Sequence, residues 1–242
     1  GQRINLPSPR QYFQIEVELS GQSILDGIRV NSLAVEHSIP PLAQQLIGEI
    51  SVLAEPRPAG NRPQVTAGVP SLFAYDVRAD IGDADVGFDA IEIFSAARPL
   101  FRDFLVGDPL VSVVPDSFVQ NDNSLKLFFP SHRLTTESAD NLRIVFESQV
   151  FVQATVFDAQ VSDTQSDEPS QNVLPGDAIP WVSTNDLRVL TTAESARDLL
   201  PSFDVQPGVV TPNGDGINDV VGLSYILVQL RQPVPVEVQV VD

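Results

Sequence analysis

The strongest constraint on the fold is a two-residue alternation of apolar and polar side chains. In "FQIEVEL" (13–19), four apolar residues alternate with Gln and Glu, which is typical of a strand with one buried and one solvated face. Similar alternation recurs at 88–94, 110–114, 125–129, 142–146, 150–161, 186–190 and 234–241. Clusters of Asn, Asp, Gly and Pro separate these segments. The pattern predicts an all-β, mostly antiparallel β-sandwich of the jelly-roll or immunoglobulin-like (Ig-like) kind.

Helices are expected to be few and short. The chain has 20 prolines, and they are scattered at the edges of segments, where they disfavour long helices. Only "PPLAQQLIGEI" (40–50) and "AESARDLL" (193–200) have a helical pattern, the second with Thr192 as a candidate N-cap.

Two units are expected along the chain. Residues 1–200 form the predicted β-sandwich, with two sub-sandwiches meeting near 100–110 as an alternative arrangement. Prolines in "LLPSFDVQPG" (199–208) mark the boundary, and residues 201–242 form a separate module.

Composition excludes several classes of function. The net charge of −18 repels nucleic acid and anionic lipid, and no apolar run reaches the ~18 residues of a membrane span. The chain has no cysteine, which excludes disulfides, thiol catalysis and Cys-ligated zinc. Asp outnumbers Glu by 21 to 11, as expected either for a soluble, turn-rich β protein or for one that binds calcium.

The stretch "DVRADIGDADVGFD" (76–89) holds five Asp residues. One interpretation is a solvated acidic loop between strands. The alternative is a calcium-binding turn between Gly82 and Gly87, with Asp83 as a ligand and with Asp80 and Asp85 as the preferred ones.

A second acidic motif, "VVTPNGDGINDVV", spans 209–221. Asn213-Gly214-Asp215-Gly216 has the residues of an Asx-stabilised turn. Asn213, Asp215, Asn218 and Asp219 are also candidate calcium ligands, because oxygen ligands at near-alternate positions in a glycine-bent loop suit that ion. The downstream bidentate Glu of an EF-hand is missing.

The motif carries a resemblance. "VVTPNGDGINDVVGLSYILVQLRQPVPVEVQVVD" (209–242) resembles the start of the FlgD-like Ig-like module. It is also similar to the C-terminal domains that Bacteroidetes-type bacteria use as type IX secretion sorting or gliding-associated tails. The resemblance implies a secreted or cell-surface bacterial protein whose signal peptide has been removed, and it implies no particular activity.

The family module continues for several further strands. Three interpretations follow for residues 209–242: the parent protein is longer, another chain completes the sheet by strand addition, or the segment packs on the upstream sandwich.

No enzymatic signature is present. The two His residues, His37 and His132, lie in no G-x-S-x-G or H-E-x-x-H context, so we predict a non-enzymatic protein. Trp181, the single Trp, is a candidate platform for stacking a sugar ring, with core or edge packing as the alternative.

The sequence therefore predicts an extracellular structural or adhesive protein, such as a subunit of a surface layer or filament. Its expected partners are further copies of itself or another surface protein, joined by strand or face contacts, with segment 13–19 as a candidate donor strand. The alternative is a carbohydrate-binding module or an accessory domain of a secreted glycoside hydrolase, with a polysaccharide as partner.

Overall fold

A computed structural model describes residues 16, 31–32, 40–138, 141–193, 199–211, 219–230 and 234–239. Within these ranges the regular elements are sixteen β-strands and three short 3-10 helices. The strands are β1 (Gln45–Val52), β2 (Gln64–Val65), β3 (Ser71–Asp80), β4 (Ala90–Phe94), β5 (Leu100–Val106), β6 (Val111–Ser112), β7 (Ser117–Gln120), β8 (Ser124–Phe128), β9 (Asn141–Ser148), β10 (Ala154–Val156), β11 (Ala159–Ser162), β12 (Gln171–Asn172), β13 (Leu174–Pro175), β14 (Arg188–Thr191), β15 (Ser202–Gln206) and β16 (Gly222–Ile226). The 3-10 helices are η1 (Ala59–Asn61), η2 (Pro130–His132) and η3 (Thr136–Ser138). The predicted all-β class is confirmed.

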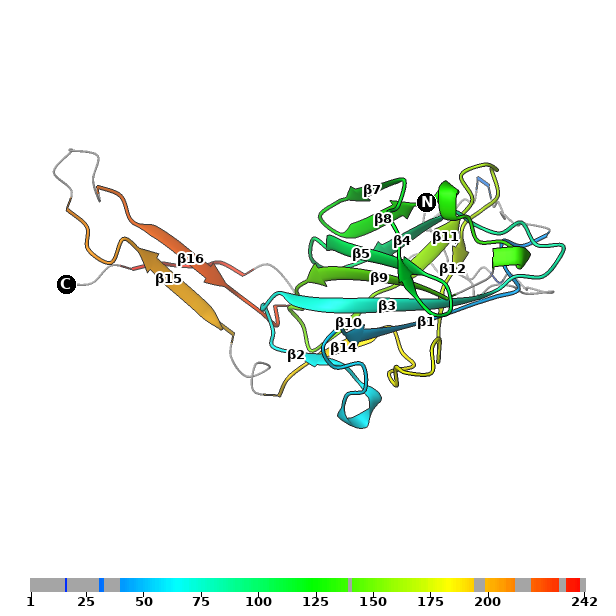
Figure 1. Ribbon diagram of the computed structural model, residues 1–242. Helices are drawn as coiled ribbons and strands as arrows, with labels where there is room; N and C mark the ends of the chain where they lie inside the picture. Colours follow the sequence, from blue (N-terminus) through cyan, green and yellow to red (C-terminus); the bar gives the residue numbers. More distant parts are fainter. Residues whose placement is uncertain are drawn as a thin grey trace, which may run out of the picture.

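Two sheets form the layers of a sandwich (Figure 1). One has the strand order β13-β1-β3-β9-β5-β6, and the other has the order β12-β11-β4-β8-β7. A small third sheet, β10-β14-β2, lies at the end of the sandwich from which β15 and β16 project. All pairings are antiparallel except β1 with β13 and β14 with β2. The predicted sandwich is therefore confirmed.

Among the described residues, the larger of two hydrophobic clusters lies between the layers and includes side chains from Leu42 to Val189, on both sides of residues 100–110. The smaller cluster contains Ala178, Ile179 and Val182. Six phenylalanines belong to the larger cluster: the Phe104 and Phe129 rings are 5.0 Å apart, and the Phe73 and Phe157 rings are 5.3 Å apart, centroid to centroid. Aromatic pairs at such separations add to the free energy gained from burial alone. The two halves of the sandwich thus share one core.

Most of the predicted strands are present. The alternating segments 88–94, 125–129 and 142–146 correspond to β4, β8 and β9. Segment 150–161 contains two short strands, β10 and β11, which join different sheets. Segment 13–19 lies outside the described residues.

The predicted helix at 40–50 is wrong. Eight residues of β1 pair with β3, from Gln45 opposite Asp80 to Val52 opposite Phe73. Leu46 and Ile50 reach the core from one face of this strand, so strand pairing and burial override the local helical spacing. Of the predicted helix at 193–200, residues 194–198 lie outside the described ranges.

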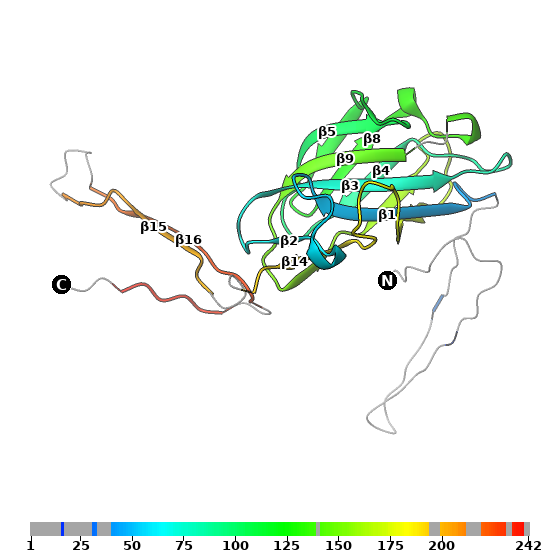
Figure 2. The ribbon, with the colours of Figure 1, turned by 60° about the horizontal axis from the view of Figure 1, so that its bottom comes forward.

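The last described segments form a projecting hairpin and an arm. Strands β15 and β16 pair antiparallel over five residues, with Phe203 opposite Tyr225 and Val205 opposite Leu223. Residues 234–239, here called the arm, leave the same end of the sandwich as a separate ribbon (Figure 2). The strand predicted at 234–241 is not formed at 234–239, because the structure gives these residues no ladder partner in the described chain.

Candidate functional site

The five Asp residues of segment 76–89 do not share one loop. Asp76 lies inside β3 and Asp89 directly precedes β4, and both are fully buried. Asp80 ends β3 and is exposed, and only Asp83 and Asp85 lie in the connecting turn. The interpretation as one solvated acidic loop is therefore wrong for the two buried ends of the segment.

The predicted calcium ligands of this segment lie in or next to a hydrogen-bonded turn. The Gly82 amide donates to Asp85 Oδ2 at 2.7 Å, and the Asp85 amide donates to the Gly82 carbonyl at 3.0 Å. Within the described ranges, no three carboxylate, imidazole or thiol groups gather closely enough to hold a metal ion. The turn is observed, and calcium binding by Asp80, Asp83 and Asp85 stays a prediction.

The other predicted ligands lie between β15 and β16. Asn213, Asp215 and Asn218 fall outside the described residues, and Asp219 is partly buried near the start of β16. Calcium binding at this motif also stays a prediction.

A row of two buried carboxylates and one partly buried guanidinium crosses the outer face of the larger sheet. Glu49 on β1 lies opposite Asp76 on β3, which lies opposite Arg143 on β9. Arg143 donates to both Asp76 oxygens, from Nε at 2.7 Å and from Nη2 at 3.0 Å. Burial raises the pKa of Asp76 from 3.8 to about 6; Arg143 opposes this rise, and the Glu49 charge adds to it. Arg143 thus pairs with Asp76, and a second buried carboxylate, Glu49, lies on the neighbouring strand; the sequence did not predict this arrangement.

Glu49 fixes the loop over this face, and its side chain is fully buried. Its Oε1 accepts the amides of Ala178 and Ile179, both at 3.0 Å. Its Oε2 accepts the Thr184 hydroxyl at 3.0 Å and the Asn185 amide at 3.1 Å. Four donors to one carboxylate compensate the burial of its charge, and they hold residues 178–185, here called the latch loop.

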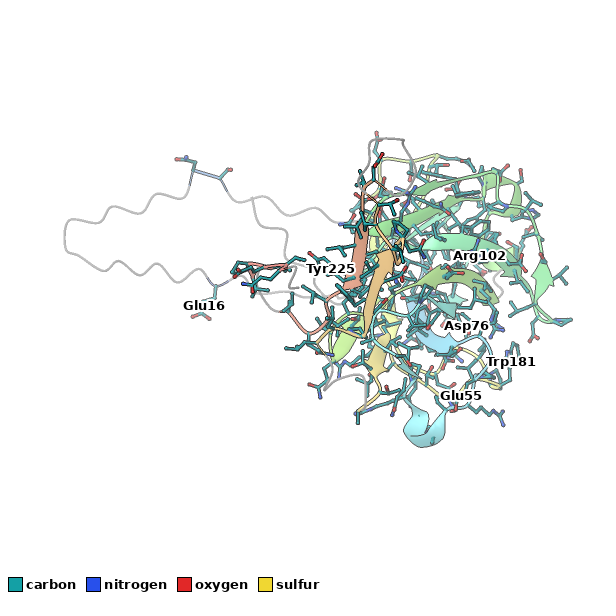
Figure 3. The ribbon with its side chains drawn as sticks, turned by 90° about the vertical axis from the view of Figure 1, so that its left-hand side faces the viewer. Glu16, Glu55, Asp76, Arg102, Trp181 and Tyr225 are labelled. Atoms are coloured by element: carbon teal, nitrogen blue, oxygen red, sulfur yellow. The ribbon has the colours of Figure 1, made fainter. Side chains whose placement is uncertain are left out.

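The latch loop presents Trp181. Arg57 donates from Nε to the Trp181 carbonyl at 3.1 Å and from Nη2 to the Pro180 carbonyl at 3.0 Å. The Trp181 residue is 37% exposed and lies at the periphery of the body (Figure 3). The structure therefore places the predicted stacking residue on a braced loop with part of its surface in solvent.

A second buried charge cluster joins three connections at one end of the sandwich. Asp89 accepts the amide and hydroxyl of Thr164, both at 2.7 Å. Arg133 contacts Asp163 through Nη1 and donates from Nη2 to the Val86 carbonyl at 2.8 Å. Every charged group here has partners, so the cluster holds the loops together. The neighbouring His132 ends η2, and its side chain makes no hydrogen bond to a serine within the described chain.

The hairpin carries the most unusual surface of the described chain. Its cross-strand pairing places four apolar side chains on one face, and they are 38–55% exposed: Phe203, Val205, Leu223 and Tyr225. Figure 3 shows Tyr225 on the hairpin, and Figure 1 shows that the hairpin projects from the sandwich. From residue 199 onward, Val228 alone is buried among the described residues. The alternation in "SFDVQ" and "GLSYI" was the signal for this face, and only the structure shows that nothing described covers it.

Comparisons with known proteins do not assign the chain to a family. The sequence matches no protein-family model and no curated protein. Among solved structures, the 35 kDa C-terminal fragment of the major pilin GBS80 of Streptococcus agalactiae is similar to 55% of this chain, at 13% identity and a TM-score of 0.31. The match spans 56% of that fragment. None of the described helices approaches the length and apolar character of a membrane span.

Proposed function

We propose that this protein is a structural or adhesive subunit of a bacterial extracellular assembly, such as a surface layer or filament. The single observation that carries the proposal is the uncovered apolar face of the β15–β16 hairpin. An isolated two-stranded hairpin is marginally stable in water, and contiguous exposed apolar surface is typical of a protein interface. Association with another molecule would bury this apolar face, which no described part of the chain covers.

The extracellular location is part of the proposal. It is supported by the resemblance of residues 209–242 to sorting and surface modules. The sandwich supports a structural role rather than catalysis, because the charged side chains of Glu49, Asp89 and Arg133 each hold loops together.

Sedimentation velocity over a range of concentrations tests the proposal. Two variants place the same charge on opposite faces of β16: Tyr225→Asp on the apolar face and Ser224→Asp on the polar face. We expect the wild type to self-associate, Tyr225→Asp to weaken association at least tenfold, and Ser224→Asp to leave it unchanged, because only the first buries a charge in the contact. A wild type that stays monomeric, or equal behaviour of the two variants, contradicts the proposal. A chain lacking residues 1–20 tests the predicted donor strand 13–19 separately.

The braced position of Trp181 supports a second candidate, carbohydrate binding. Because the latch loop is held by Glu49 and Arg57, the partly exposed Trp181 is preorganised to stack on a sugar ring. Polysaccharide pull-down is expected to lose binding with Trp181→Ala. The matched control is Phe118→Ala on β7, an aromatic residue with 46% exposure. Equal binding by both variants, or no binding by the wild type, argues against this role.

A further inference from the structure

The hairpin has open hydrogen-bonding edges as well as an open face. Within the described ranges its sheet contains only β15 and β16, so each strand has one edge without a strand partner among those residues. Such an edge is a template for a further strand. A strand added there would also extend the apolar face formed by Phe203, Val205, Leu223 and Tyr225.

The arm has the pattern of that missing strand. Val234, Val236 and Val238 alternate with polar residues or proline and are 44–52% exposed. No backbone hydrogen bond joins residues 234–239 to another described residue. Successive residues of a strand direct their N–H groups to opposite edges. Pro235 therefore removes a donor from one edge only, and the edge served by the three valines can still pair.

Contacts with the sandwich keep the arm away from the β15–β16 hairpin of the same chain. Val228, between them in sequence, is 1% exposed and donates its amide to the Leu199 carbonyl at 3.2 Å. The Gln229 amide donates to the Phe151 carbonyl at 2.7 Å, and this residue has a φ of 62°. This anchored bend directs the two segments outward as diverging ribbons (Figure 2).

We infer that the arm pairs with the hairpin of a second copy of this chain, so that two copies exchange arms. This inference rests on the proposed self-association and names its partner and its elements. Each copy carries one donor strand and one acceptor hairpin, so a reciprocal exchange closes with two copies and leaves neither element unpaired.

The area of exposed apolar surface favours a second copy. Only three of the 31 described residues from 199 onward are charged: Asp204, Asp219 and Glu237. This fraction is lower than the 19% of the whole chain, so most of the surface that meets in an exchange is uncharged. Seven half-exposed apolar side chains, at ~150 Å² for each whole side chain, present on the order of 500 Å² per copy. An exchanged pair thus buries on the order of 1,000 Å² of apolar surface, close to the ~1,200 Å² of a stable interface before backbone pairing is counted.

Cross-linking tests the exchange directly, because the chain has no natural cysteine. Ser224→Cys on β16 and Glu237→Cys on the arm both replace residues of the polar face. The two single variants of the full chain are mixed and treated with a short bismaleimide. The control mixture pairs Ser224→Cys with Asp83→Cys, an exposed position on the sandwich.

We expect at least tenfold more covalent dimer from the first mixture than from the control. We also expect dimer rather than an internally linked monomer from the Ser224→Cys/Glu237→Cys double variant. An internally linked monomer would show that the arm pairs with its own hairpin and would overturn the inference. Yields equal to the control overturn it as well. If the cross-linking fails but sedimentation still shows self-association, the proposed function stands and only the arm exchange is overturned. A protein that sediments as a monomer contradicts both the proposed function and the exchange.

Discussion

Replacing Glu49 by Gln is the sharpest test of how the sandwich is braced. The substitution keeps the shape of the side chain and two acceptor bonds, to the amides of Ala178 and Ile179. It places an NH₂ group where Oε2 now accepts two donors. The Thr184 hydroxyl can rotate to accept, whereas the Asn185 amide then faces another donor.

The magnitude follows from these four bonds. A buried donor left without a partner costs ~1–3 kcal/mol, and the three remaining bonds each lose on the order of 1 kcal/mol when the acceptor becomes neutral. Removing a buried charge and its repulsion with Asp76 offsets part of this loss. We therefore expect the free energy of unfolding to fall by about 2–4 kcal/mol.

Urea unfolding of Glu49→Gln measures this change as a lower midpoint at an unchanged slope. Glu55→Gln is the matched control, because Glu55 is exposed and surface substitutions change stability by within ~0.5 kcal/mol. A second readout is the pKa of Asp76, which should fall in Glu49→Gln because the Glu49 charge raises it. An unfolding free energy equal to that of the control, together with an unchanged Asp76 titration, would refute the bracing role of Glu49.

Three further predictions concern the sandwich and the motifs. The pKa of Asp76 is about 6 in the folded chain and 3.8 ordinarily, so its contribution to stability is fully present below pH 3.8 and is lost as the pH rises through 6. NMR titration should show this pKa, and Asp76→Asn should remove that part of the pH dependence of unfolding. Gly87→Ala should destabilise the fold by about 2 kcal/mol or more, because φ is +78° and a Cβ would lie 2.3 Å from the Leu134 carbonyl oxygen. Gly60→Ala, with φ +71° and open space, should cost only ~1 kcal/mol in the same urea assay. If the acidic motifs bind calcium, millimolar calcium should raise the melting temperature by several degrees over EDTA; identical curves would count against both sites.

The sequence was informative where structure follows a local period. Alternation located β4, β8 and β9, because a strand with one buried face must repeat every two residues. It failed at 40–50, where the helical spacing is local but the partner that decides the structure, β3, lies about 30 residues away. The alternation also did not show that the first part of the acidic stretch 76–89 belongs to a strand, β3. The partner that neutralises the buried Asp76 is Arg143, which lies 67 residues further on.

The candidate sites show the same limit: residue types are visible in the sequence, whereas contacts with distant residues are not. Trp181 was identified from its residue type, but its exposure and bracing depend on Glu49, whose four donors lie 129–136 residues away. No local pattern marks a single Glu in a strand as a buried acceptor. The apolar face of β15–β16 was visible as alternation, yet alternation cannot show whether a face is covered.

The sandwich buries most of its large apolar side chains, whereas the described residues from 199 onward leave most of theirs exposed. In the sandwich, large side chains fill one core, and buried carboxylates such as Glu49 and Asp89 have several donors each. From residue 199 onward the described chain holds 31 residues, yet these include 14 of the 24 large hydrophobic residues that are exposed in the described chain. Because burial of apolar surface is the dominant favourable term in folding, these residues gain little of it within the described chain. We therefore expect them to gain it on assembly, so that substitutions there should change association much more than the stability of the sandwich.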